Sequence, residues 1–177
     1  MAKLNGKQKT PITEFKTQGV SSSKSDQKSI SVDGQDLYLK ISNYGKGKLA
    51  MCLDLETADG EPYATISKCF GNFYRDETFV PNCSTFIDTN NCPQSLLNPV
   101  FDALGARPRT VFGEPYMIQS GFCEYPIYDF NPEKLKEYDA QGFAEYQNEY
   151  AKNFSIEQRN LNIALFGSDI YDDFEME

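Results

Sequence analysis

Hydrophobic and polar residues alternate along the first part of the chain in the pattern of antiparallel strands. Residues 37–41 (Leu-Tyr-Leu-Lys-Ile) place an aliphatic side chain at every second position, which is the period of a half-buried strand. A returning strand is expected over residues 49–55, and a third over residues 63–67 after an Asp-Gly turn at residues 59–60. Because the connections are too short for parallel crossovers, the pattern predicts an antiparallel meander.

A polar corner at residues 88–91 separates the next predicted strand from the first predicted helix. Residues 84–87 (Ser-Thr-Phe-Ile) are β-branched and aromatic, which is typical of a short buried strand. After Pro93, a residue suited to the first helical position, apolar side chains recur at helical spacing up to Gly105, which is a natural end for a helix. Pro99 falls inside this pattern, so we expect a kink or two short helices there.

The second half of the chain returns to β-structure and then becomes helical. Strand-like segments occupy residues 110–112, 116–119 and 122–128. Asn131-Pro132 has the residue types that open a helix, and an aromatic stripe follows at helical spacing. Ser155 with Gln158 has the spacing of a capping box, which predicts the start of another helix that ends at Gly167.

These elements predict one α+β domain over residues 31–168, an antiparallel sheet of about five to seven strands with helices packed on one face. Residues 1–30 are rich in Lys, Gln, Ser and Thr and contain few large apolar side chains, so we expect a flexible basic arm. Residues 169–177 interleave acids with a few apolar residues and are expected to form an acidic tail.

The charge is distributed unevenly along the chain. Residues 1–28 carry six lysines against two acids, whereas residues 29–168 carry eleven basic and nineteen acidic residues. Residues 169–177 add five acids and no base, and the whole chain has a net charge of −9. An acidic body disfavours binding to a phosphate backbone and favours a basic partner surface, so direct contact with nucleic acid is expected only through the basic arm.

The chain contains no histidine, which removes Ser-His-Asp and Cys-His catalysis and the commonest metal ligand. Its five cysteines include no Cys-x-x-Cys pair, so we expect no zinc site and no cofactor. An odd cysteine count without a signal-peptide core indicates reduced thiols in the cytoplasm. No apolar run approaches the length of a membrane span, so no membrane partner is expected.

Two stretches supply the candidate partner-binding residues. In the corner at residues 88–91, the polar side chains are suited to turning the chain and capping the following helix, and a functional role is the alternative. The corner candidates are Asp88, Asn90 and Asn91. The acidic tail contributes Asp169, Tyr171, Asp172, Asp173, Phe174 and Glu175.

Several segments of the chain resemble a known family. Residues 86–93 (Phe-Ile-Asp-Thr-Asn-Asn-Cys-Pro), 120–128 (Ser-Gly-Phe-Cys-Glu-Tyr-Pro-Ile-Tyr) and the turn at 60–65 carry the resemblance. The chain is similar to an uncharacterised small domain family of conjugative elements and phages of gut bacteria, and the resemblance covers about residues 35–150. Such genes often travel with anti-restriction and anti-CRISPR genes, so the resemblance implies a context of host defence but no catalytic residues.

The composition and the resemblance together predict a non-enzymatic protein that inhibits a host nucleic-acid-targeting defence. The expected partner is a host defence protein such as a CRISPR effector nuclease, whose positively charged channel an acidic surface can occupy. Two alternatives stay open. One is a small enzyme that uses carboxylates near Asp88, with or without a metal; Asp54, Asp59 and Glu61 would be further oxygen ligands for a metal such as magnesium. The other is a DNA-processing accessory protein that uses the basic arm.

Overall fold

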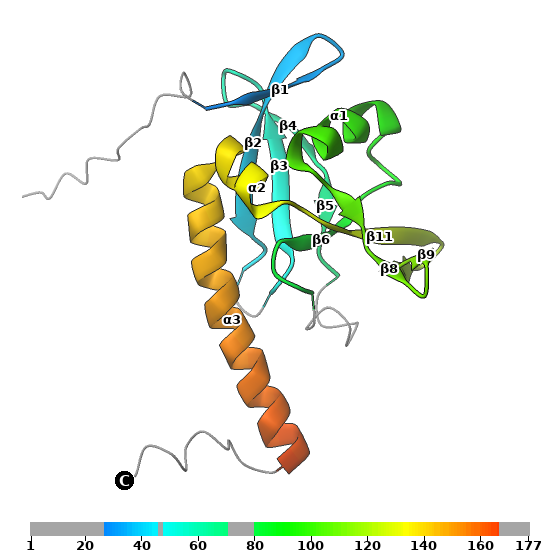
Figure 1. The fold of residues 1–177 in the computed structure, drawn as a ribbon, viewed down its shortest axis with the longest axis vertical. Coiled ribbons are helices and arrows are strands. Elements are labelled where there is room, and N and C mark those ends of the chain that lie inside the picture. Colours follow the sequence, from blue (N-terminus) through cyan, green and yellow to red (C-terminus); the bar gives the residue numbers. More distant parts are fainter. Residues whose placement is uncertain (1–26, 46–47, 71–79, 167–177) are drawn as a thin grey trace, which may run out of the picture.

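Antiparallel sheets and three helices make up the computed structural model, as the sequence predicts for an α+β domain (Figure 1). The structure describes residues 27–45, 48–70 and 80–166, and only the backbone of residues 157–166. Within these residues the strands form a four-stranded sheet, a five-stranded sheet and a separate two-stranded hairpin. No helix in this part of the chain is both long enough and apolar enough to cross a bilayer.

The first sheet is the predicted meander, with its strands in chain order. Its strands are β1 (Ser29–Val32), β2 (Gln35–Asn43), β3 (Met51–Glu56) and β4 (Pro62–Thr65). Leu37, Leu39 and Ile41 are buried, while Lys40 between them is exposed, so the predicted alternation is confirmed. β1 begins inside the segment predicted as an arm, because the buried side chain of Ile30 belongs to the core.

The chain changes sheets at Ile66, where the sequence predicted one strand over residues 63–67. β4 ends at Thr65 in the first sheet, and β5 (Ser67–Lys68) pairs with β6 (Ser84–Ile87) in the second. Ile66 joins both sheets, because its N–H donates to Leu53 and its carbonyl accepts from the N–H of Asp88. These bonds divide the predicted strand in two.

The second sheet has the order β10-β11-β6-β5, with a further short strand β7 beside β11. The new strands are β7 (Arg107–Pro108), β10 (Met117–Ser120) and β11 (Cys123–Asp129). All four residues of β6 are buried, as expected for the strand before the corner. A separate hairpin, β8 (Thr110–Val111) and β9 (Glu114–Pro115), is inserted before β10.

Helix α1 (Gln94–Leu104) follows the corner and ends as predicted. Gly105 has φ 60° and ψ 38°, the left-handed conformation that glycine adopts readily at the end of a helix. Pro99 lies inside one continuous helix, so of the two expected outcomes, a kink or two short helices, the second is wrong. The buried side chains of Leu96, Val100 and Leu104 hold the helix on the core despite the hydrogen bond that proline removes.

Asn131 caps helix α2 (Pro132–Tyr138), because its side chain accepts from the N–H groups of Glu133 and Lys134. Helix α3 (Ala140–Phe166) then runs without a break, so the predicted new helix at Ser155 is wrong. The Ser155 hydroxyl donates to the carbonyl of Ala151 one turn earlier and therefore forms no N-cap. α1, α2 and α3 pack against the same core as the first sheet.

β1 pairs only with the first part of β2, and the junction of α2 and α3 provides hydrogen bonds to the backbone of β2 beyond it. The Asp139 carboxylate accepts from the N–H of Ile41 at 2.7 Å and from the N–H of Gly142 at 2.9 Å. Gln27 donates to the carbonyls of Leu39 and Tyr138, so it ties the start of the described chain to the same junction. Two side chains that are distant from β2 in the sequence, Gln27 and Asp139, thus satisfy backbone groups of β2 that a neighbouring strand would otherwise bind.

Candidate interaction surface

The corner after β6 is built around a buried carboxylate. Asp88 is only 3% exposed, and it lies on the core side of the turn. Its oxygens accept from the side-chain amide of Asn91 at 2.8 and 3.0 Å and from the Asn91 N–H at 3.2 Å. Lys68 of the neighbouring β5 forms an ion pair with it at 3.1 Å. The corner is therefore a closed hydrogen-bonded turn.

The expected capping role of this corner is wrong, although the expected turn is present. The N-cap of α1 is Pro93, and no side chain caps the helix. Five residues separate Asp88 from the first residue of α1, so Asp88 is too early in the chain to cap the helix. It instead accepts a hydrogen bond from Asn91 in the loop and forms an ion pair with Lys68. Lys68 is distant in the sequence, and no local pattern indicates the pair.

The environment of Asp88 sets its ionisation. Burial alone would raise the pKa of Asp88, but hydrogen bonds from Asn91 and Lys68 outweigh burial and hold the pKa below its usual range. A general acid at neutral pH needs a raised pKa, so this carboxylate is tuned in the opposite direction. Among the residues that the structure describes, no three acidic or cysteine side chains come together in a way that could hold a metal ion.

We expect Asp88→Ala to lower the melting temperature by about 5 °C at pH 7. It removes charged hydrogen bonds worth about 1.5–3 kcal/mol and leaves Asn91 and Lys68 without their acceptor. Because the folded-state pKa is lowered, the stabilisation is present above the unfolded pKa of about 3.9 and is lost as the pH falls through the folded value. Thermal melts at pH 7 and pH 3 check this, and the difference between parent and variant should shrink at pH 3. A variant that melts like the parent at pH 7 but loses activity would make the corner a functional site.

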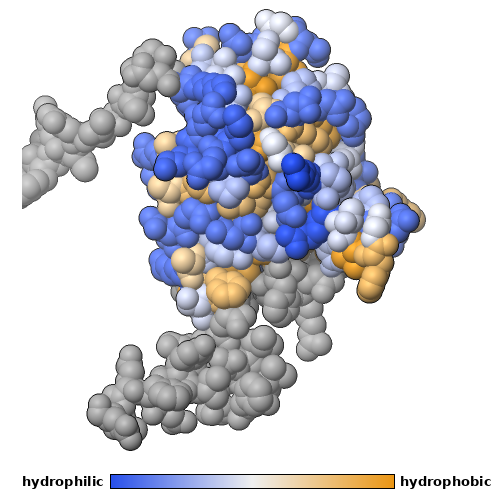
Figure 2. All heavy atoms as spheres, in the orientation of Figure 1, coloured by the Kyte–Doolittle hydropathy of each residue, from blue (hydrophilic) through white to orange (hydrophobic). Residues whose placement is uncertain are grey.

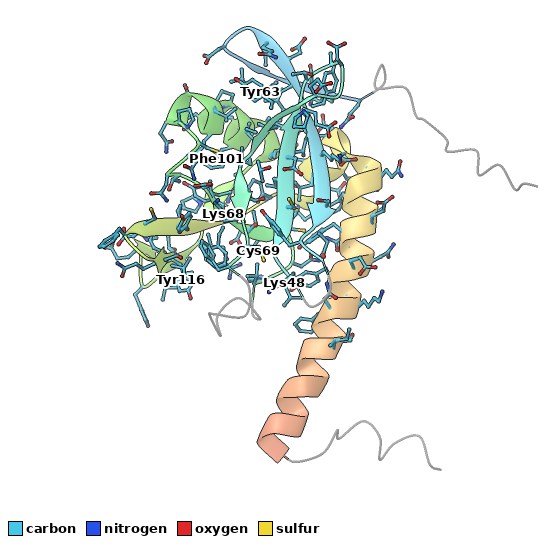
Figure 3. The ribbon with its side chains drawn as sticks, turned by 180° about the vertical axis from the view of Figure 1, so that it is seen from behind. Lys48, Tyr63, Lys68, Cys69, Phe101 and Tyr116 are labelled. Carbon is cyan, nitrogen blue, oxygen red and sulfur yellow. The ribbon has the colours of Figure 1, made fainter. Side chains whose placement is uncertain are left out.

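The corner is joined to a pair of hairpins that project from the body. The Asn90 side chain donates to the carbonyl of Glu124 in β11 at 3.1 Å. In Figure 3, Lys68 lies where the β10–β11 hairpin leaves the body. Asn90 and Asn91 are both exposed, whereas the predicted tail residues at positions 169–177 lie outside the described residues.

Both hairpins start from one point on β11. The N–H of Arg109 donates to the carbonyl of Ile127, and the N–H of Ile127 donates to the carbonyl of Tyr116. The β8–β9 hairpin occupies the segment between Arg109 and Tyr116, and Figures 1 and 3 show it beside the β10–β11 hairpin. We call residues 110–124 the double hairpin.

A fully exposed phenylalanine occupies the tip of each hairpin. Phe112 is 104% exposed and Phe122 is 105% exposed. Val111 and Met117 are also exposed, so four of the six large apolar side chains that the described residues expose lie on the double hairpin. Figure 2 shows the resulting apolar surface on this projection. Apolar surface gathered in this way marks an interaction site more often than single exposed residues do.

The backbone at the first tip is strained. Phe112 has φ 53° and Gly113 has φ 88°, the pair of positive values that a type I′ turn requires. Asparagine and glycine tolerate this conformation, whereas a large side chain in it costs about 1–2 kcal/mol. Phe112 therefore contributes neither packing nor a favourable turn to the isolated protein, which makes it a candidate for contact with a partner.

Sequence reasoning missed the two phenylalanines because it assigned both to strands. The available signal was glycine beside each of them, in Phe112-Gly113 and Gly121-Phe122. A two-residue turn with glycine at one central position is typical of a tight hairpin and places its other central residue at the tip. Gly121 has φ 63°, which is the value that the first central position of a type II′ turn requires.

A model of a domain of unknown function, DUF4313, matches residues 38–150. The chain belongs to the DUF4313 family. No curated protein and no solved structure matches it. The DUF4313 match begins in β2 and ends in α3, so it includes the Asp88 corner and the whole double hairpin. The candidate surface is therefore part of the DUF4313 domain, whereas the acidic tail lies beyond it.

Proposed function

We propose that this DUF4313 protein acts by binding and that it inhibits a host nucleic-acid-targeting defence protein such as a CRISPR effector nuclease. The observation that carries the binding role is the double hairpin, with Phe112 and Phe122 fully exposed at its tips. Large aromatic side chains are the residues that most often anchor protein interfaces. The resemblance to domains of conjugative elements and phages supplies the defence context.

Charge supports a partner with a basic surface. The two turns at one end of the first sheet expose acids, namely Asp33, Asp36, Asp59 and Glu61. Arg109, at the base of the double hairpin, is paired with Asp129 at 2.8 Å. An acidic protein is attracted to the positively charged channel in which such an effector holds nucleic acid, and it is repelled by nucleic acid itself.

The direct test is binding of the purified protein to a purified, guide-loaded CRISPR effector nuclease across a salt series. We expect a complex that blocks cleavage of target DNA and whose association rate falls as the salt concentration rises, because screening at 0.1 M acts over about 10 Å. Absence of binding at low salt would overturn the inhibitor role for that effector. Binding that is indifferent to salt would remove the electrostatic part of the proposal.

Deleting residues 169–177 is expected to slow association by about threefold to tenfold while the melting temperature stays the same. The segment carries five acids and no base, and surface charges act mainly on the association rate. Stopped-flow or surface-binding kinetics measure the rate. A variant with Asp169, Asp172, Asp173, Glu175 and Glu177 replaced by Asn or Gln keeps Tyr171 and Phe174, so it separates charge from apolar contact. An unchanged rate in both variants would show that the tail takes no part.

A further inference from the structure

The two tips of the double hairpin repeat the same chemistry. The first has Phe112-Gly113-Glu114 and the second has Phe122-Cys123-Glu124, so a carboxylate follows each exposed ring by two residues. Glu114 and Glu124 are both exposed, as are the two rings. Neither carboxylate has a basic partner within the described part of the chain. Each tip therefore presents an apolar ring and a free negative charge together.

This combination selects between kinds of partner. A purely apolar pocket would accept the ring but would strip water from the adjacent carboxylate without replacing its hydrogen bonds, which is costly. A basic surface without apolar platforms would pair the carboxylate and leave the ring in water. Grooves that bind single-stranded nucleic acid satisfy both groups, because they place basic side chains along the phosphates and stacking side chains beside the bases.

We propose that the double hairpin imitates two unstacked nucleotides and occupies the groove in which its target binds single-stranded nucleic acid. Phe112 and Phe122 take the places of bases, and Glu114 and Glu124 take the places of phosphates. The inference rests on the proposed function and specifies its site and partner surface. Phenylalanine has no hydrogen-bonding edge, so it imitates the stacking face of a base and not its sequence information.

The turns hold this arrangement in place before binding. Gly113 and Gly121 have positive φ values of 88° and 63°, which fit tight two-residue turns. The β10–β11 hairpin is paired over four residues from Met117 to Ser120, and Asn90 fixes the carbonyl of Glu124. Preorganised tips lose little conformational entropy on binding, unlike a free single strand.

Competition with single-stranded DNA tests the inference. The probe is a fluorescent single-stranded DNA bound to the purified, guide-loaded effector, and the protein is titrated into this complex. We expect displacement of the DNA, with no ternary complex. Simultaneous binding of the protein and the DNA would overturn the imitation while leaving the inhibitor function intact. Failure to bind the effector would remove both.

Isosteric neutral variants test the role of the carboxylates. Glu114→Gln/Glu124→Gln is expected to weaken binding at least tenfold and to flatten its salt dependence, because two of the charges that meet the basic groove are removed. Glu133→Gln/Glu145→Gln removes the same number of exposed charges on α2 and α3 and is the matched control, which should compete with DNA almost like the parent. Equal losses in both variants would show that only net charge matters and would overturn the nucleotide imitation.

Discussion

The double variant Phe112→Asn/Phe122→Ser is expected to lose at least about 100-fold in affinity for the effector while it folds as well as the parent. Each phenylalanine is fully exposed in the free protein, so its removal opens no cavity. An aromatic anchor at an interface contributes about 2 kcal/mol or more, and two anchors account for a factor of this size even when their effects are not additive. Affinity measured by calorimetry or surface binding checks the loss.

The melting temperature provides an independent readout for the same variant. Asparagine before Gly113 suits the type I′ turn better than phenylalanine does, and serine after Gly121 suits the second turn. We therefore expect an unchanged or slightly higher melting temperature. Tyr63→Ser is the matched control, because Tyr63 is 47% exposed on β4 and lies far from the double hairpin in Figure 3. Full affinity in the double variant, or an equal loss in the Tyr63 control, would contradict the assignment of the surface.

Gly142→Ala is expected to destabilise the fold by about 2–3 kcal/mol and to lower the melting temperature by roughly 5–10 °C. A Cβ atom at Gly142 would lie 2.4 Å from the carbonyl oxygen of Ile41 and 2.1 Å from Oδ2 of Asp139. The Ile41 carbonyl belongs to the backbone of β2, so α3 must move away from the sheet. The loss exceeds the gain of about 1 kcal/mol that alanine brings to a helix interior.

The Gly142→Ala substitution would also displace the carboxylate of Asp139. This carboxylate accepts from both Ile41 and Gly142, so displacing it also breaks the bonds that complete the edge of β2. Asn148→Ala, at an exposed position of the same helix, is the control and should melt like the parent or slightly higher. Denaturant and thermal unfolding measure both variants. A Gly142→Ala protein as stable as the parent would show that the helix does not approach β2 this closely.

Local patterns in the sequence correctly predicted the features that a few neighbouring residues decide. The alternation at residues 37–41 predicted β2, the buried run at residues 84–87 predicted β6, and Asn131-Pro132 predicted the cap of α2. Gly105 correctly predicted the end of α1. These features depend on period, capping and left-handed φ values, which a few neighbouring residues decide.

Local patterns were misleading where a distant contact outweighed them. Ser155 has the spacing of a helix start, yet α3 continues through it. Pro99 was expected to kink α1 or to divide it in two, but the buried leucines and valine of that helix keep it as one helix on the core. In both cases one hydrogen bond is lost or redirected within a helix that packs elsewhere along its length, and packing supplies most of the stability of a helix in a protein.

By itself the sequence determined an acidic α+β domain without histidine chemistry and with an antiparallel meander, because composition and two-residue periodicity are properties of the chain alone. Only the tertiary structure decided that Lys68 neutralises Asp88, that Asp139 and Gly142 meet the edge of β2, and that the two hairpins with Phe112 and Phe122 at their tips lie side by side. Each of these depends on how strands distant in sequence pair and on which side chains the packed layers leave uncovered. No local period encodes that information.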